Sequence, residues 1–172
     1  VASTRAHVPD AESKIVFDKF HIAKHLGEAV DRVRRQEHKR LRADGHSRLT
    51  GTRYHWLRNP LHETAAQAQA ANSLRRSRLQ TARAWRLKET LTDFWTDRWR
   101  KPARTFFERW YAWAIRSRLE PMKKVARMLN TRLPQLLNSI RIPVTNAMSE
   151  SLNSKIQWIK YTAHGFKSRE GF

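Results

Sequence analysis

The pattern of apolar and polar positions changes its period near the start of the chain. Residues 13–18, SKIVFD, form a tight apolar and β-branched run that is typical of a strand covered on both faces of a sheet. From Ile22 the apolar positions recur every three or four residues, as on one side of a helix. Glu28–Arg32 and Asp31–Arg35 are spaced as i,i+4 ion pairs on its polar side. The pattern predicts one strand, followed by a helix that ends near Gly45.

The middle of the chain predicts a bundle of amphipathic helices. Residues 46–60 contain glycine and proline and predict a loop or a short extended segment, whereas residues 62–100 are almost continuously helix-permissive. The prolines at 102, 121 and 134 suit helix starts or a kink. The apolar positions of this region include an aromatic cluster of Phe106, Phe107, Trp110, Tyr111 and Trp113. We expect this cluster in the core of the bundle, with stacking on an unpaired nucleobase as the alternative.

A last helix is predicted from about Thr145 to Tyr161. Its apolar side would hold Met148, Leu152, Ile156, Ile159 and Ala163, and its polar side Asn146, Glu150, Asn153, Gln157 and Tyr161. Glu150 is the only acidic residue of this helix. A lone glutamate on a polar helical face is usually only solvated, so the helix by itself does not predict a site.

The charge balance points to a polyanionic partner. The chain has 35 lysine and arginine residues against 15 aspartate and glutamate residues, a formal net charge of +20. Nucleic acid is the first candidate for such a surplus. The basic segment RRQEHKRLR (34–42) can be read as a nuclear-localisation patch, but such charge runs are usually a solvated helix face. The segment NSLRRSRLQTAR (72–83) can be read as a solvated helix face or as a DNA-tracking surface, and the sequence leaves both readings open.

Several classes of site and of protein are excluded or disfavoured. The chain has no cysteine, so disulfides, thiolate zinc sites and cysteine nucleophiles are excluded. No apolar run approaches the ~20 residues that span a bilayer. His21 and His25 have the spacing of a zinc-protease motif, but residue 22 is isoleucine where the motif has its catalytic glutamate. The first residue is Val1, which suggests a processed product or a fragment.

Asp18 needs an explanation, because a buried strand rarely ends in a carboxylate without a partner. Acids at strand ends commonly serve as metal ligands in α/β folds. The segment IVFDKFHIAKHLGEAVDRVRR, followed far along the chain by PVTNAMSESLNSKIQWIKYTAHGFKSREGF, closely resembles the DDE transposases of bacterial insertion sequences, of the ISL-three type. The resemblance covers nearly the whole chain, and its two end motifs are the specific part.

The resemblance implies a fold that is mainly α with one or few strands: an incomplete RNase H-like α/β core interrupted by a helical insertion. Residues 1–45 and 142–172 would belong to the core and residues 46–141 to the insertion. Asp18 matches the second catalytic aspartate and Glu150 the catalytic glutamate, and both would be metal ligands. Further positions match residues that bind DNA or support the site, namely His21 at the rim of the pocket, Asn146, Asn153, Lys155, Lys160 and Lys167. Tyr161 departs from the family, which has a basic residue there.

The resemblance also implies a cofactor, partners and a location. Mg²⁺ (or Mn²⁺) suits carboxylate ligands, and two such ions serve both ends of a phosphodiester displacement. The implied partners are DNA, as transposon ends and target, and further copies of the chain in the active complex, in a bacterial cytoplasm near the nucleoid. Asp10 is the only aspartate before Asp18, and it is too close to lie on a neighbouring strand. We therefore expect the first catalytic aspartate to lie outside this chain, and the chain alone to be inactive.

Two other functions remain open at this stage. One is a non-catalytic, basic helical DNA-binding module, such as a degenerate transposase. The other is a basic RNA-binding protein of a large ribonucleoprotein. Neither needs Asp18 or Glu150, so substitution of these two carboxylates separates them from the catalytic reading.

Overall fold

The structure is a computed structural model, and it describes residues 18–95 and 102–141, with His7, Pro9 and residues 154–155, 157–159 and 161–162. The chain divides into two compact units, residues 1–141 and residues 142–172. The described residues are almost all helical or in short turns, and they contain no strand. The predicted mainly α fold is thus confirmed. Residues 13–17 of the expected strand lie outside the described part, so the RNase H-like core stays a prediction.

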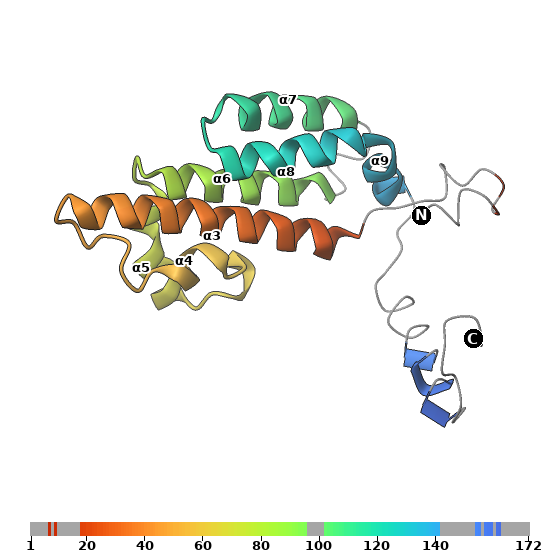
Figure 1. Cartoon of the computed structure of the whole chain (residues 1–172), viewed down its shortest axis with the longest axis horizontal. Helices are drawn as coiled ribbons and strands as arrows, with labels where there is room; N and C mark the ends of the chain where they lie inside the picture. Colours follow the sequence, from red (N-terminus) through yellow and green to blue (C-terminus); the bar gives the residue numbers. More distant parts are fainter. Residues whose placement is uncertain are drawn as a thin grey trace. The chain divides into compact units, whose positions relative to one another are not determined.

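The first unit is a bundle in which α-helices pack side by side (Figure 1). Its helices are α3 Lys19–Ala43, α4 Arg53–Leu57, α5 Ala65–Arg75, α6 Gln80–Thr92, α7 Ala103–Arg116, α8 Glu120–Thr131 and α9 Leu133–Arg141, with the 3₁₀ turns η1 Pro60–His62 and η2 Asp93–Trp95. The long helix α3 packs against α6, α8 and α4. Helix α7 packs against α6 and α8. Helix α3, which the family resemblance assigns to the catalytic core, therefore packs directly against helices of the expected insertion.

Helix α3 confirms the prediction from apolar spacing. Its buried side includes Ile22, Leu26 and Val30, which recur at a spacing of four residues. The helix ends at Ala43, and Gly45 follows with φ of 79°, in the left-handed region that favours glycine. The local sequence is thus sufficient to set both the buried face and the end of this helix.

The ion pairs predicted along α3 are partly as expected. Asp31 pairs with Arg35, with Nε and Oδ2 3.2 Å apart, and also with Arg34 at 2.9 Å. A carboxylate oxygen of Glu28 lies 4.0 Å from Nδ1 of His25. Glu28, expected to pair with Arg32 in the following turn, therefore contacts a residue of the preceding turn instead.

The prediction of a loop or an extended segment over residues 46–60 is partly wrong, because this segment contains the short helix α4. Trp56 is fully buried, and its Nε1 donates a hydrogen bond to Thr52 Oγ1 at 3.2 Å. The Thr52 hydroxyl in turn donates to the Leu49 carbonyl at 2.8 Å. A helix of five residues is too short to be stable by itself, so burial of Trp56 against the bundle stabilises it.

The helical pattern of residues 62–100 is interrupted within the described part. Between α5 and α6, the Ser77 hydroxyl donates to the Leu74 carbonyl at 2.6 Å and accepts from the Leu79 amide at 3.3 Å. Serine favours helix ends because its side chain competes for backbone partners in this way. The break lets α6 turn back along α3, against which it packs.

The aromatic cluster of α7 lies in the core, as predicted, with one exception. Phe107 and Trp110 are buried, and the Trp110 Nε1 donates to the Leu87 carbonyl at 2.9 Å. Phe106 and Tyr111 are partly buried against the same core. The exception is Trp113, which is 38% exposed.

Among the described residues, no helix has the length and apolar content to cross a membrane.

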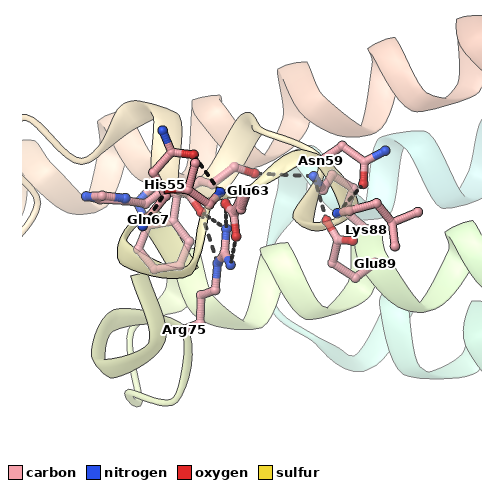
Figure 2. Close-up of polar contacts among 10 residues, drawn as sticks. His55, Asn59, Glu63, Gln67, Arg75, Lys88 and Glu89 are labelled. Atoms are coloured by element: carbon pink, nitrogen blue, oxygen red, sulfur yellow. Dashed lines mark hydrogen bonds and ion pairs between the residues drawn. The ribbon is translucent and has the colours of Figure 1, made fainter. Parts of the chain in front are cut away.

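Figure 2 shows a buried ion pair that ties α5 to the segment before it. Arg75 and Glu63 form two hydrogen bonds of 2.7 and 2.6 Å, and Arg75 also donates to the His55 carbonyl at 2.6 and 3.0 Å. The hydrogen bonds from Arg75 hold the pKa of Glu63 below its ordinary value of 4.5. The guanidinium also lies 4.5 Å from the ring centroid of Trp85. Arg75 is therefore a structural residue.

Candidate functional site

Asp18 is held in a defined position at the start of α3. Its backbone is extended, with φ of −70° and ψ of 119°, and it is the N-cap of the helix. One carboxylate oxygen accepts a hydrogen bond from the Phe20 amide at 2.8 Å. The other lies 2.7 Å from Nδ1 of His21. A negatively charged N-cap side chain is stabilised by the positive end of the helix dipole.

The geometry of Asp18 is compatible with service as one metal ligand. Its side chain is 30% exposed, and an ionised carboxylate offers only acceptor oxygens. Hard divalent cations prefer such oxygen donors. Within the described residues there is no group of three or more histidine, aspartate or glutamate side chains that could hold a metal.

The second predicted ligand, Glu150, lies outside the described residues, as do Asn146, Asn153, Lys160 and Lys167. Their proximity to Asp18 stays a prediction. Lys155 belongs to the helical positions of the second unit, and it is exposed. His21 contacts Asp18 directly and its side chain is 73% exposed, whereas its role at the rim of a pocket stays a prediction.

The basic segment of α3, residues 34–42, has one side that faces the bundle and one that faces solvent. Glu37 is buried, Arg34 pairs with Asp31, and Arg40 lies 3.7 Å from Glu37. Arg40 is also exposed. Counted from Arg32, just before this segment, four other exposed cations recur at spacings of three, four and three residues, and we refer to them as the α3 basic stripe: Arg32, Arg35, Lys39 and Arg42. These spacings place the four side chains on one face of the helix over about 15 Å. A row of cations of this length can contact consecutive phosphates of a nucleic acid strand.

The second basic segment, residues 72–83, is also divided by the structure. Arg75 is buried in its contacts with Glu63, whereas Arg76 and Arg78 are exposed. Sequence reasoning missed the role of Arg75, because its partners lie 12 and 20 residues away. A clue was present in the position of Arg75 four residues after Ala71, which is buried on the same side of α5.

Comparisons with known proteins agree with the sequence motifs. The family model of the ISL3 transposases matches residues 1–172. The chain is 30% identical over 171 residues to the transposase for insertion sequence element IS1001 of Bordetella parapertussis. That match covers 98% of this chain and 42% of the relative, so the chain spans less than half the length of that protein. No solved structure is significantly similar to the chain.

Proposed function

Since this chain belongs to the ISL3 family of transposases, we propose that it carries two carboxylates of the catalytic centre of a DNA transposase. The reaction is cleavage of a DNA strand at a transposon end and transfer of that end to a target. The proposal is carried by Asp18, a partly exposed carboxylate fixed at the first turn of α3 within the family motif. Its expected partner is Glu150.

In this proposal Asp18 and Glu150 hold Mg²⁺ or Mn²⁺, and residues 13–18 and the Glu150 helix belong to an RNase H-like core. Bound divalent ions would activate the attacking hydroxyl and stabilise charge on the leaving oxygen. The Phe20 amide and His21 orient the Asp18 carboxylate, since each contacts one of its oxygens. This fixed orientation reduces the reorganisation needed to bind an ion.

The α3 basic stripe is the proposed contact for the DNA backbone. Arg32, Lys39 and Arg42 are exposed, and among the described residues no ion pair joins them to an acid. Arg35, the fourth cation of the stripe, forms an ion pair with Asp31. Contacts of this kind give affinity and position without sequence preference, and they weaken steeply with salt.

The isolated chain is expected to lack part of the catalytic centre. We propose that the first catalytic aspartate is supplied from outside these 172 residues and that the isolated chain does not cut DNA. Asp10 is the only aspartate of this chain before Asp18, and it is too close to Asp18 to lie on a neighbouring strand. Active complexes of several copies on DNA are part of the same proposal.

The test uses Asp18→Asn and Glu150→Gln in the complete transposase, on DNA that carries the termini of its own insertion sequence. Each substitution is expected to abolish Mg²⁺-dependent cleavage while leaving affinity for that DNA within about twofold. Glu28→Gln, an exposed acid on α3, is the matched control and should leave cleavage unchanged. Full cleavage by either variant would refute the catalytic role of that carboxylate.

A second candidate function is a basic helical module that binds DNA without cutting it. The observation in its favour is the α3 basic stripe, which needs no carboxylate centre to bind phosphates. The same experiment separates the two functions. If the complete protein binds its termini but neither cleaves them nor responds to Asp18→Asn, the binding module is the better description.

A further inference from the structure

A groove lies between the exposed edges of α6 and α7. Its volume is about 370 Å³ and its lining is Thr90, Pro102, Thr105, Phe106, Arg109, Trp110 and Trp113. This volume is at the small end of ligand pockets, which range over about 300–1,000 Å³. One planar ring system with a short substituent fits such a volume, whereas a base-paired duplex does not. We refer to it as the α6–α7 groove.

The aromatic walls of the groove are fixed by the core behind them. Trp110 is only 2% exposed, its indole N–H donates to the Leu87 carbonyl at 2.9 Å, and its ring lies 5.7 Å from that of Phe107. Phe106 packs on Phe94 with centroids 6.0 Å apart. A ligand ring therefore meets a preformed apolar surface and causes little ordering on binding.

Trp113 and Arg109 form the accessible edge of the groove. Thr105, Arg109 and Trp113 follow one another at i, i+4 and i+8 on α7, so they share one face of the helix. Trp113 is 38% exposed although the other tryptophan of α7 is buried. An exposed indole beside a cation and hydroxyl groups is suited to a flat aromatic ligand that carries negative charge.

The charge of the surroundings selects among such ligands. Glu108 is the only acidic residue of α7, whereas Arg104, Arg109 and Arg116 are exposed on it, and the chain carries a net charge of +20. A nucleobase attached to a phosphodiester backbone combines the flat ring and the anion that this edge would bind. An apolar peptide segment would leave the arginines without a counter-charge.

We propose that the α6–α7 groove binds one unstacked base of single-stranded or locally opened DNA. Trp113 stacks on the base, Arg109 contacts the adjoining phosphate, and the hydroxyls of Thr90 and Thr105 face the edge of the base. The inference rests on the proposed function, since it takes DNA as the substrate. It adds a site that recognises an unpaired nucleotide, apart from the Asp18 carboxylate and the α3 basic stripe.

The test measures binding of the 172-residue chain to two single strands by fluorescence anisotropy. One probe is an oligothymidylate of twelve nucleotides, and the other is an abasic backbone of the same length and charge. Trp113→Ala is expected to weaken binding of the oligothymidylate by about 5- to 100-fold and to leave abasic binding unchanged. Trp113→Phe should retain most of the affinity. Arg109→Ala should weaken both probes, because a phosphate contact does not depend on the base.

Trp158→Ala is the matched control, because it removes an indole that is 68% exposed and does not line the groove. Circular dichroism of each variant verifies folding, and Arg109→Ala provides a second variant at an exposed position. Equal affinity of the unmodified chain for the two probes, or equal losses for both with Trp113→Ala, would overturn the base site while leaving the DNA partner intact. Absence of binding to either probe would overturn the DNA-binding function and the base site together. Failure of the cleavage test alone would affect only the catalytic proposal.

Discussion

The carboxylate of Glu37 offers the sharpest test of how this bundle is held together. Glu37 is 3% exposed on α3, and its two oxygens accept hydrogen bonds from the Gln80 amide at 2.8 Å, the Thr81 amide at 2.7 Å and the Thr81 hydroxyl at 2.7 Å. Leu79, the N-cap residue of α6, provides no side-chain cap. Glu37 therefore caps α6 from another helix, 43 residues earlier in the chain.

The cost of Glu37→Ala follows from these contacts. The substitution leaves two backbone N–H groups at the start of α6 without an acceptor, that of Thr81 buried and that of Gln80 partly buried. A buried unsatisfied donor costs about 1–3 kcal/mol. The substitution also removes a negative charge from the positive end of the helix dipole, worth about 0.3–1 kcal/mol. A hydroxyl group reorients more readily than a backbone amide, so the Thr81 hydroxyl is left out of this sum. Together these terms predict a loss of about 3–5 kcal/mol in the free energy of unfolding.

The assay is urea unfolding of the 172-residue chain, followed by far-ultraviolet circular dichroism. Glu37→Gln should lose less than Glu37→Ala, about 2 kcal/mol, because its amide oxygen still accepts while its NH₂ group faces a donor. Glu28→Ala, an exposed acid on the same helix, should change stability by at most about 0.5 kcal/mol. A loss below about 1 kcal/mol for Glu37→Ala would show that water or a shift of α6 satisfies these amides, and the reasoning would be wrong.

Two further predictions concern acid sensitivity and salt. The pKa of Glu63 is lowered by its hydrogen bonds with Arg75. The pair therefore contributes stability that is complete above the unfolded carboxyl pKa of about 4.5 and is lost as the pH falls through the lower native pKa. Glu63→Gln should remove this part of the pH dependence in thermal unfolding scans. Replacing Arg32, Lys39 and Arg42 by alanine should reduce the slope of log affinity for duplex DNA against log salt by about 3, in filter binding or anisotropy titrations.

Each of these two predictions has a control in the same bundle. The pKa of Glu120 is also lowered, by Lys123 and Arg127, but this acid is exposed, so its contribution should disappear in high salt while that of Glu63 persists. Alanine at Lys123, Lys124 and Arg127 removes the same charge from α8. If this set reduces the salt slope as much as the α3 substitutions do, binding follows net charge and the α3 basic stripe has no special role.

The sequence predicted the parts of the fold that depend on near neighbours. The apolar spacing from Ile22 gave the buried side of α3, and Asp44-Gly45 gave its end. Pro121 lies in the first turn of α8, as its fixed φ suggests. These features depend on residues within about one or two turns of each other, so a local pattern contains them.

The parts that sequence reasoning missed depend on contacts across the bundle. Nothing near Glu37 indicates that its carboxylate caps α6, and nothing near Arg75 indicates Glu63 as its partner. The helix α4 was missed because burial of Trp56, and not local propensity, stabilises it. For the candidate site, the motif around Asp18 was found in the sequence, but its role as helix cap emerged only from the geometry of the Phe20 amide.

In the proposed complex, the continuous helix α3 would set the distance between the catalytic carboxylate and the DNA-binding cations. Asp18 lies at the amino-terminal end of the helix, and the cations at positions 32–42 lie 14 to 24 residues further on. At a rise of 1.5 Å per residue, they are about 21–36 Å from the carboxylate along the axis. With about 3.4 Å between successive base pairs, this corresponds to roughly 6–11 base pairs. Because α3 is one continuous helix, this separation is fixed, and the proposed function then predicts cleavage up to about one duplex turn from the bound phosphates.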